Sequence, residues 1–298
     1  LQGVEQEGEK TMGKIVIVGS GPAGCSAALY AARAGQEVVV ISMGMGALSK
    51  AELIQNYYGF EEGITGAELY RQGVAGAKAV GAEFITAEVV GLDYTGSLVV
   101  QTTEGDYPAD AVIMATGTGR IAPKIAGLAE HEGRGVSYCA TCDAFFYRGK
   151  TAAVLGSGEY ALHEVQALLP LAGKVILCTN GEPLTADFPE GVEICTEKLA
   201  AVEGEEKVSA LRLENGELLP VEGLFVALGV AGSAALARKL GAPVENGRIV
   251  VDEKMQTGIP GLFAAGDCTG GMLQVCKAVY EGALAATEAI KMLRGKKR

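Results

Sequence analysis

The pattern of a strand, a glycine-rich turn, a helix and a second strand occurs twice in this chain. In the first copy, apolar residues 14–18 lead directly into Gly19-Ser20-Gly21-Pro22-Ala23-Gly24. An alanine-rich stretch and a second apolar stretch, residues 38–41, follow. Glycines at this spacing permit a tight turn, close approach of the backbone to a pyrophosphate, and close packing of helix on strand. The unit therefore predicts a parallel α/β layer that binds a dinucleotide.

The second copy predicts a second domain of the same kind. Residues 15–41 align without a gap on residues 152–178, so that Gly19 matches Gly156 and Gly21 matches Gly158. A length of 298 residues accommodates two domains of ordinary size. We therefore predict an α/β protein with two Rossmann-like, three-layer dinucleotide-binding domains. The alternative for the second copy is that it keeps the fold but has lost its ligand.

Domain boundaries follow from the remaining apolar stretches. A strand is expected at residues 110–117, another at 247–252, a third at 261–267 ending in a carboxylate, and a helix at 273–293. An apolar strand that ends in Gly-Asp suits the first domain better than the second, so the first domain is predicted to be discontinuous. The predicted divisions are a disordered lead-in at 1–12, the first domain at 13–117 and 245–298, and the second domain at 118–244.

Composition narrows the possible partners and location. The net charge of −11 argues against nucleic acid or an anionic membrane as the main partner. No apolar run approaches the length that spans a membrane. Five of the seven cysteines are scattered singly, as expected of thiols in a reducing compartment, and this predicts a cytoplasmic protein.

Two cysteines stand apart from the others in the sequence Cys139-Ala140-Thr141-Cys142-Asp143. Such a pair either binds zinc or carries two electrons as a dithiol. Zinc needs four ligands at short spacing, and the other cysteines and the two histidines supply no second pair. We therefore predict a redox dithiol and no metal site, with Asp143 either handling a proton or capping the next helix.

Together these motifs resemble the low-molecular-weight thioredoxin reductases over nearly the whole chain. The matching residues are Gly19 to Gly24, Asn56-Tyr57-Tyr58-Gly59-Phe60, Ala115-Thr116-Gly117, Gly135 to Asp143 and Gly261 to Asp267. The resemblance implies FAD in the first domain, a dithiol on the second, and thioredoxin or a similar small dithiol protein as electron acceptor. It also implies a homodimer.

The resemblance assigns roles to individual residues. Cys142 is expected beside the isoalloxazine, Cys139 attacks the partner disulfide, and Asp143 donates a proton. Gly19, Gly21 and Gly24 are expected to face the pyrophosphate, and Asp267 a ribityl hydroxyl. The full set expected to bind the cofactor is Gly19, Gly21, Pro22, Ala23, Gly24, Ser42, Asn56, Thr116, Gly117, Gly266, Asp267, Gln274 and Val275.

The second domain departs from the family where NADPH is expected to bind. Its second strand ends in Cys178-Thr179-Asn180-Gly181, with neither the arginines that grip a 2′-phosphate nor the carboxylate that binds a free ribose. Glu159 and Tyr160 within the turn are expected to repel or block phosphates. NADPH is therefore a doubtful cofactor.

Other departures are similar to the ferredoxin-dependent flavin thioredoxin reductases. They are Gly44 to Leu48, Tyr57-Tyr58, Cys268 to Gly271 and Leu273-Gln274. Ferredoxin, which is acidic, is therefore the predicted electron donor. It would need a basic patch, for which Lys277, Arg238-Lys239 and the tail at 294–298 are candidates.

Two alternatives remain open. One is an ordinary NADPH-dependent thioredoxin reductase. The other is a non-catalytic electron carrier or redox-sensing module, with or without a second flavin in the second domain. Cys268 and Cys276, near the expected FAD site, are predicted to be buried small apolar residues.

Overall fold

The first parallel sheet gathers strands from both ends of the chain. The computed structural model describes residues 13–117, 125–228 and 232–295, so the predicted lead-in at 1–12 lies outside the described residues. The sheet order is β18 (Leu262–Ala264), β7 (Ala111–Met114), β1 (Lys14–Val18), β2 (Glu37–Ser42) and β3 (Glu83–Thr86). Because β18 pairs in parallel with β7, the discontinuity of this α/β unit is confirmed.

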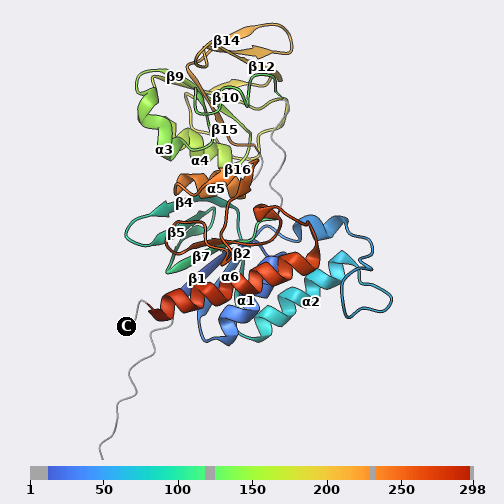
Figure 1. Ribbon diagram of the computed structural model, residues 1–298. Helices are drawn as coiled ribbons and strands as arrows, with labels where there is room; N and C mark the ends of the chain where they lie inside the picture. The colour runs from blue at the N-terminus through green and yellow to red at the C-terminus, as the bar shows by residue number, and fades with distance from the viewer. Residues whose placement is uncertain (1–12, 118–124, 229–231, 296–298) are drawn as a thin grey trace, which may run out of the picture.

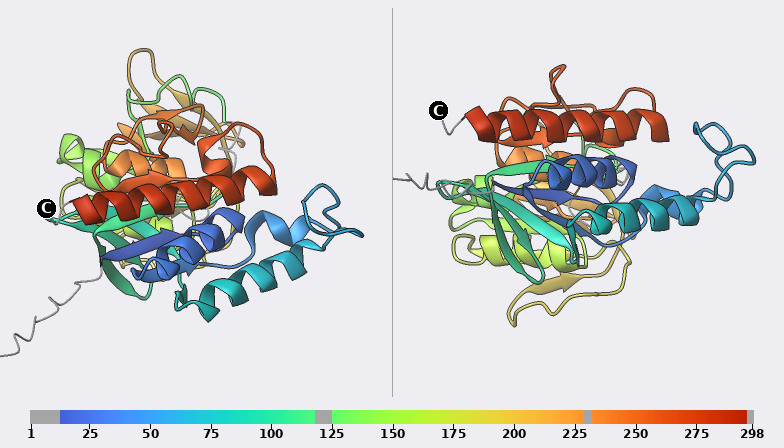
Figure 2. Two further views of the ribbon diagram at one scale, coloured as in Figure 1. Left: turned by 60° about the horizontal axis from the view of Figure 1, so that its bottom comes forward. Right: turned by 90° about the horizontal axis from the view of Figure 1, so that it is seen from below.

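Alternation along β1 divides the first domain into three layers. Ile15 and Ile17 pack against helices α1 (Pro22–Arg33) and α6 (Val275–Gly295). Val16 and Val18 pack on the opposite side, against the antiparallel sheet β4 (Val89–Tyr94), β5 (Leu98–Thr102) and β6 (Gly105–Ala109). Successive strand residues point to opposite faces, so the apolar run on β1 serves both layers. Figure 2 shows α6, α1 and α2 (Gly66–Ala79) on one side of the molecule.

The second domain repeats the first in register. β9 (Thr151–Leu155), α4 (Glu159–Leu168) and β10 (Lys174–Cys178) each begin 137 residues after β1, α1 and β2. The parallel sheet has the order β11 (Glu193–Cys195), β10, β9, β15 (Gly223–Val226) and β8 (Val136–Ser137). An antiparallel sheet of β12 (Leu199–Glu203), β13 (Ala210–Leu213) and β14 (Leu218–Pro220) accompanies it. The two predicted Rossmann-like units are thus confirmed.

The two domains meet on β4. Figure 1 shows α5 (Ser233–Lys239) and β16 (Val244–Glu245) between the two lobes. Both α4 and α5 contact β4, and Lys239 Nζ lies 3.5 Å from the Val90 carbonyl oxygen. β16 forms a short hairpin with β17 (Arg248–Ile249), which links the second domain to the return into the first.

Three of the predicted strands are shorter than expected. The strand predicted at 110–117 contains only β7, that predicted at 247–252 only β17, and that predicted at 261–267 only β18. β18 ends early because Gly266 takes a positive φ of 83° and the chain turns into the short helix η3 (Gly266–Thr269). Among the described residues no helix is both long and apolar enough to cross a bilayer.

Candidate active site

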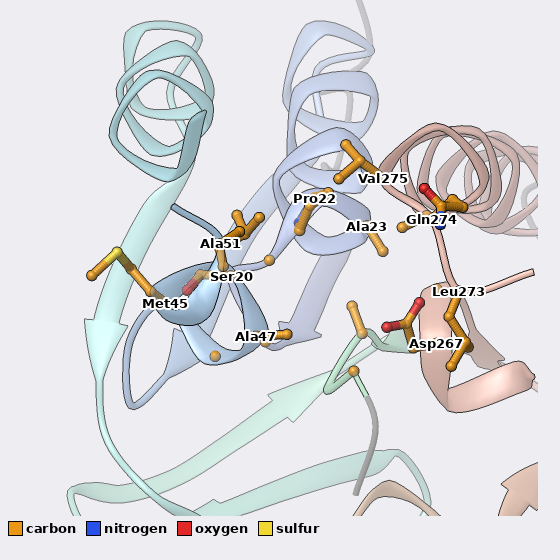
Figure 3. Close-up of a pocket in the computed structure, with 18 of the residues that line it drawn as sticks. Ser20, Pro22, Ala23, Met45, Ala47, Ala51, Asp267, Leu273, Gln274 and Val275 are labelled. Carbon is orange, nitrogen blue, oxygen red and sulfur yellow. The ribbon is translucent and has the colours of Figure 1, made fainter. Parts of the chain in front are cut away.

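A cavity of about 400 Å³ opens beside the first glycine-rich turn (Figure 3). It lies at the carboxyl ends of β1, β7 and β18, where ligands of open parallel sheets bind. Of the residues expected to bind a cofactor, all except Gly24 and Ser42 line it. The described lining residues all come from the first domain.

The three glycines of the first turn are required for different structural reasons. A Cβ on Gly19 would collide with the Ala115 carbonyl, and a Cβ on Gly24 with the Gly19 carbonyl. A Cβ on Gly21 would meet nothing within 4 Å. Gly19 and Gly24 therefore hold the turn close to its neighbours, whereas Gly21 keeps the cavity side open.

The start of α1 faces this opening without a side-chain cap. Gly21 is the N-cap residue and makes no side-chain capping bond, and Pro22 follows in the first turn. The first backbone N–H groups of a helix have no partner within it, and the helix dipole favours negative charge there. This end of α1 therefore suits a pyrophosphate.

Polar side chains in the cavity suit the remainder of a flavin nucleotide. Thr116 Oγ1 is buried and has no hydrogen-bond partner within the described protein. The carboxylate of Asp267 points into the cavity (Figure 3). At the rim, Asn56 Nδ2 donates to Gln274 Oε1 at 2.9 Å. A buried hydroxyl without a partner is costly, so Thr116 favours a bound polar group. The residues present therefore fit FAD.

Ser42 lies behind this surface, where it supports the turn. Its hydroxyl donates to Ser20 Oγ at 2.7 Å, and Ser20 Oγ lies 3.1 Å from the Tyr70 hydroxyl. Ser20 itself lines the cavity. Ser42 was expected to contact the cofactor, but the Ser20 side chain lies between Ser42 and the cavity.

An ion pair on α6 holds the loop that carries Asp267. Glu281 Oε2 accepts from the Gly266 N–H at 2.8 Å and from Thr269 Oγ1 at 3.0 Å. Lys277 Nζ lies 2.9 Å from the same carboxylate oxygen and donates to the Gly266 and Gly270 carbonyls at 2.8 and 2.5 Å. The i,i+4 spacing of this pair is visible in the sequence, but the spacing alone does not show that the pair holds a loop.

The predicted redox dithiol lies in a turn of the second domain, Cys139 to Cys142, which we call the redox turn. Cys139 is buried and disulfide-bonded, and the cysteines outside this turn are free. The side chain of Cys142, expected beside the flavin, lies outside the described residues. The turn continues as α3 (Ala140–Asp143) and η2 (Ala144–Tyr147).

Asp143 is connected to the turn through Ser137. The buried Ser137 hydroxyl donates to Asp143 Oδ2 at 2.7 Å and accepts from the Cys139 N–H at 3.1 Å. Asp143 is the N-cap residue of η2, but its side chain makes no capping bond. The carboxylate therefore orients toward the redox turn and does not serve as a helix cap.

The expectation that Tyr160 blocks the second glycine turn is wrong. Its ring is buried and its hydroxyl donates to the Tyr138 carbonyl at 2.9 Å, directly before Cys139. Another segment lies against the second turn, where the Thr185 N–H donates to the Ser157 carbonyl at 2.8 Å. A Cβ on Gly158 would lie 3.0 Å from Thr185 Oγ1. Glu159 remains in the first turn of α4, partly exposed.

Two further expectations from the sequence need correction. Cys268 is buried as predicted, and burial raises the pKa of its thiol to about 12, but Cys276 is exposed. Two of the basic residues predicted to attract ferredoxin are largely buried. The Lys239 side chain is 2% exposed and that of Lys277 13%, and both are ion-paired. Most of the basic tail, residues 296–298, lies outside the described residues.

The fold and the two sites define a two-domain flavin-dependent disulfide oxidoreductase. The family model described as pyridine nucleotide-disulphide oxidoreductase matches residues 13–282. The thioredoxin reductase of Aquifex aeolicus is 36% identical and the match covers 95% of this chain and 94% of the relative. The chain therefore belongs to the pyridine nucleotide-disulphide oxidoreductase family and, within it, to the thioredoxin reductases. It is a FAD-dependent oxidoreductase that acts on a sulfur group.

Solved structures show the same relationship. The atypical thioredoxin reductase TRi of Desulfovibrio vulgaris Hildenborough is 39% identical, with a TM-score of 0.89 over 96% of this chain and 99% of that one. A ferredoxin-flavin thioredoxin reductase from Clostridium acetobutylicum is 35% identical, with a TM-score of 0.73 over 95% and 99%.

Proposed function

We propose that the enzyme passes electrons through FAD and the Cys139–Cys142 pair to thioredoxin or a similar small dithiol protein, with ferredoxin as electron donor in place of NADPH. The observation that carries the donor assignment is the second glycine turn. Thr185 is hydrogen-bonded to this turn through Ser157, and residues 179–181 after β10 include neither an arginine for a 2′-phosphate nor a carboxylate for a free ribose. The similarity to a protein named ferredoxin-flavin thioredoxin reductase supports the same donor.

The missing contacts weaken nicotinamide binding by a predictable amount. A hydrogen bond to a charged group contributes about 1.5–3 kcal/mol, and the stretch between Arg148 and Arg212 supplies no guanidinium for a 2′-phosphate. This loss corresponds to an affinity roughly ten- to a hundredfold lower. Glu159 adds a negative charge at the helix end where the pyrophosphate would sit. We therefore expect NADPH to bind too weakly to serve as the donor.

The side chains around the redox turn suit thiol–disulfide exchange. A bound flavin, once reduced by the electron donor, would supply the two electrons that open the disulfide. The Cys139 thiolate then attacks the partner disulfide, which forms a mixed disulfide and releases one partner thiolate. Cys142 attacks the Cys139 sulfur, which restores the pair and frees the second partner thiolate. In this scheme Asp143, which accepts a hydrogen bond from the Ser137 hydroxyl at 2.7 Å, relays a proton to a leaving thiolate.

The donor is tested by anaerobic reduction of the flavin in purified protein. We expect reduced ferredoxin to bleach the flavin quickly, and NADPH or NADH at millimolar concentration to do so slowly or not at all. Fast, saturable bleaching by micromolar NADPH would establish the ordinary NADPH-dependent thioredoxin reductase instead.

The acceptor step is tested separately with a Cys142→Ser variant. We expect this variant to retain its flavin and to be reduced by the donor, but to lose reduction of thioredoxin. Thioredoxin reduction at a near-normal rate would refute the dithiol assignment and leave the donor result standing. Size-exclusion chromatography with light scattering tests the homodimer, which we propose from the resemblance alone.

A further inference from the structure

A buried ion pair lies beneath the redox turn. Glu164 on α4 and Lys239 at the end of α5 approach to 2.6 Å between Oε1 and Nζ, and their side chains are 1% and 2% exposed. Removing two charges from water costs several kcal/mol per ion, which only good geometry and further hydrogen bonds recover. The further hydrogen bonds of Glu164 and Lys239 therefore matter, because they help to offset this cost and show which segment the pair holds in place.

The second oxygen of Glu164 binds the redox turn itself. Oε2 accepts from the backbone N–H of Ala140, the residue that follows Cys139, at 2.5 Å. Burial by itself raises the pKa of Glu164. However, the hydrogen bond from His163, the charge and hydrogen bond of Lys239 and the Ala140 N–H together bring that pKa below its ordinary value. The carboxylate is therefore ionised and fully partnered.

Tyr160 completes the anchor on the other side of Cys139. It lies one helical turn from Glu164 on α4, and its hydroxyl donates to the Tyr138 carbonyl at 2.9 Å. Lys239 Nζ lies 5.4 Å from the centre of the Tyr160 ring. The peptide groups on both sides of Cys139 are thus fastened to α4 by buried side chains. The same lysine reaches the Val90 carbonyl of the first domain at 3.5 Å.

We propose that Glu164, with Lys239 as its counter-ion, is a positioning residue that sets the dithiol–disulfide equilibrium of the redox turn. This inference rests on the proposed function, in which the Cys139–Cys142 pair carries the electrons. It extends that function by naming the two charged groups, far apart in sequence, that adjust the pair.

Two physical effects act through this pair. The anchor at Ala140 restrains the turn in the geometry that a disulfide requires, so its loss favours the open dithiol. The charge balance acts on the thiolate, because a nearby negative charge disfavours it and a positive charge favours it. A more stable thiolate stabilises the reduced state and makes the pair a stronger oxidant.

These effects predict opposite shifts for the two partners. Glu164→Leu removes the anchor and leaves the positive charge, so the equilibrium moves toward the dithiol. Lys239→Met leaves an uncompensated carboxylate beside the turn, so it moves toward the disulfide. We expect each shift to be about tenfold, which for a two-electron couple corresponds to about 30 mV. Glu164→Gln, whose amide oxygen still accepts from Ala140, should fall between wild type and Glu164→Leu.

The measurement is a redox titration of the full-length flavoprotein in dithiothreitol buffers. Two electrons and two protons pass from dithiothreitol, which becomes its cyclic disulfide, to the Cys139–Cys142 disulfide. Acid quenching, alkylation and mass analysis of the tryptic peptide then give the reduced fraction. The matched control is Glu203→Leu, because Glu203 forms an ion pair with Arg212 at the same 2.6 Å on the exposed β12–β13 sheet of the same domain.

The expected result is opposite shifts for Glu164→Leu and Lys239→Met, with Glu203→Leu unchanged. If both variants remain within about twofold of wild type, or if both shift in the same direction, the pair only stabilises the domain and the proposal is wrong. If Glu164→Leu fails to fold, Lys239→Met and Glu164→Gln still decide between these outcomes. The titration uses neither thioredoxin, ferredoxin nor a nicotinamide, so its failure is distinct from failure of the Cys142→Ser test.

Discussion

Among single residues, two glycines of the first turn serve different purposes: Gly21 leaves room for a ligand, and Gly24 permits close packing. A side chain at Gly21 would project into open space at the N-terminus of α1, where the pyrophosphate is expected. Gly21→Glu should therefore fold but purify without flavin, because a carboxylate would occupy the helix end and repel phosphate. The measurement is flavin absorbance relative to protein absorbance, together with circular dichroism. A yellow variant with unchanged flavin content would contradict the assignment of this cavity.

The matched control is Gly24, three residues along the same turn. A Cβ there would collide with the backbone carbonyl of Gly19, which cannot move as a flexible side chain does. Gly24→Ala should thus lower the melting temperature even though it adds only one methyl group. The two substitutions together distinguish a glycine that leaves room for a ligand from one that permits packing.

At the scale of elements, helix α6 determines the shape of the flavin site through the loop before it. The Lys277 ammonium bridges Glu281 and the carbonyls of Gly266 and Gly270, on either side of Asp267. Lys277→Met should loosen this loop and raise the dissociation constant for FAD about tenfold, as expected for a lost charge-assisted hydrogen bond. The measurement is flavin rebinding to protein stripped of its flavin.

The control for this substitution lies on the same helix. Lys291 forms an ion pair with Glu288 at 2.6 Å but is 66% exposed. Exposed pairs of this kind contribute little to stability, so Lys291→Met should leave flavin binding unchanged. Equal effects of the two substitutions would show that α6 acts through its net charge and not through the loop.

For the whole molecule, the arrangement of the two domains matters for access to the redox turn. The second domain packs on β4, and in this arrangement Cys139 is only 5% exposed. A protein disulfide cannot reach a thiol so placed, so we expect the domains to separate before thioredoxin is reduced. In the chemically reduced enzyme, a bulky maleimide should label the exposed Cys276 at least about tenfold faster than Cys139, because only an opened state exposes the latter. Both peptides are quantified by mass spectrometry from one sample, so Cys276 serves as an internal reference. Equal labelling rates would mean that Cys139 is accessible without any opening.

The two repeated units and most of the residues that line the cavity of the first domain were predictable from the sequence. This was possible because these features are local. A glycine spacing, a period of apolar residues and a strand that ends in Gly-Asp each reflect the backbone of one short stretch. The offset of 137 residues between the two copies can also be read from the sequence. The same offset relates the residues that pair between β1 and β2 to those that pair between β9 and β10.

The directions in which side chains outside these local motifs point became visible only in the folded protein. Tyr160 was expected to block the second turn, yet it lies inward, because its ring is buried and its hydroxyl finds the Tyr138 carbonyl. Glu164 and Lys239 are separated by 75 residues and carry no local pattern, and their pairing depends on how α5 returns beside α4. Lys239 looked like a surface charge for the same reason. Buried polar contacts between distant segments are set by packing, and packing is not a property of any single stretch of sequence.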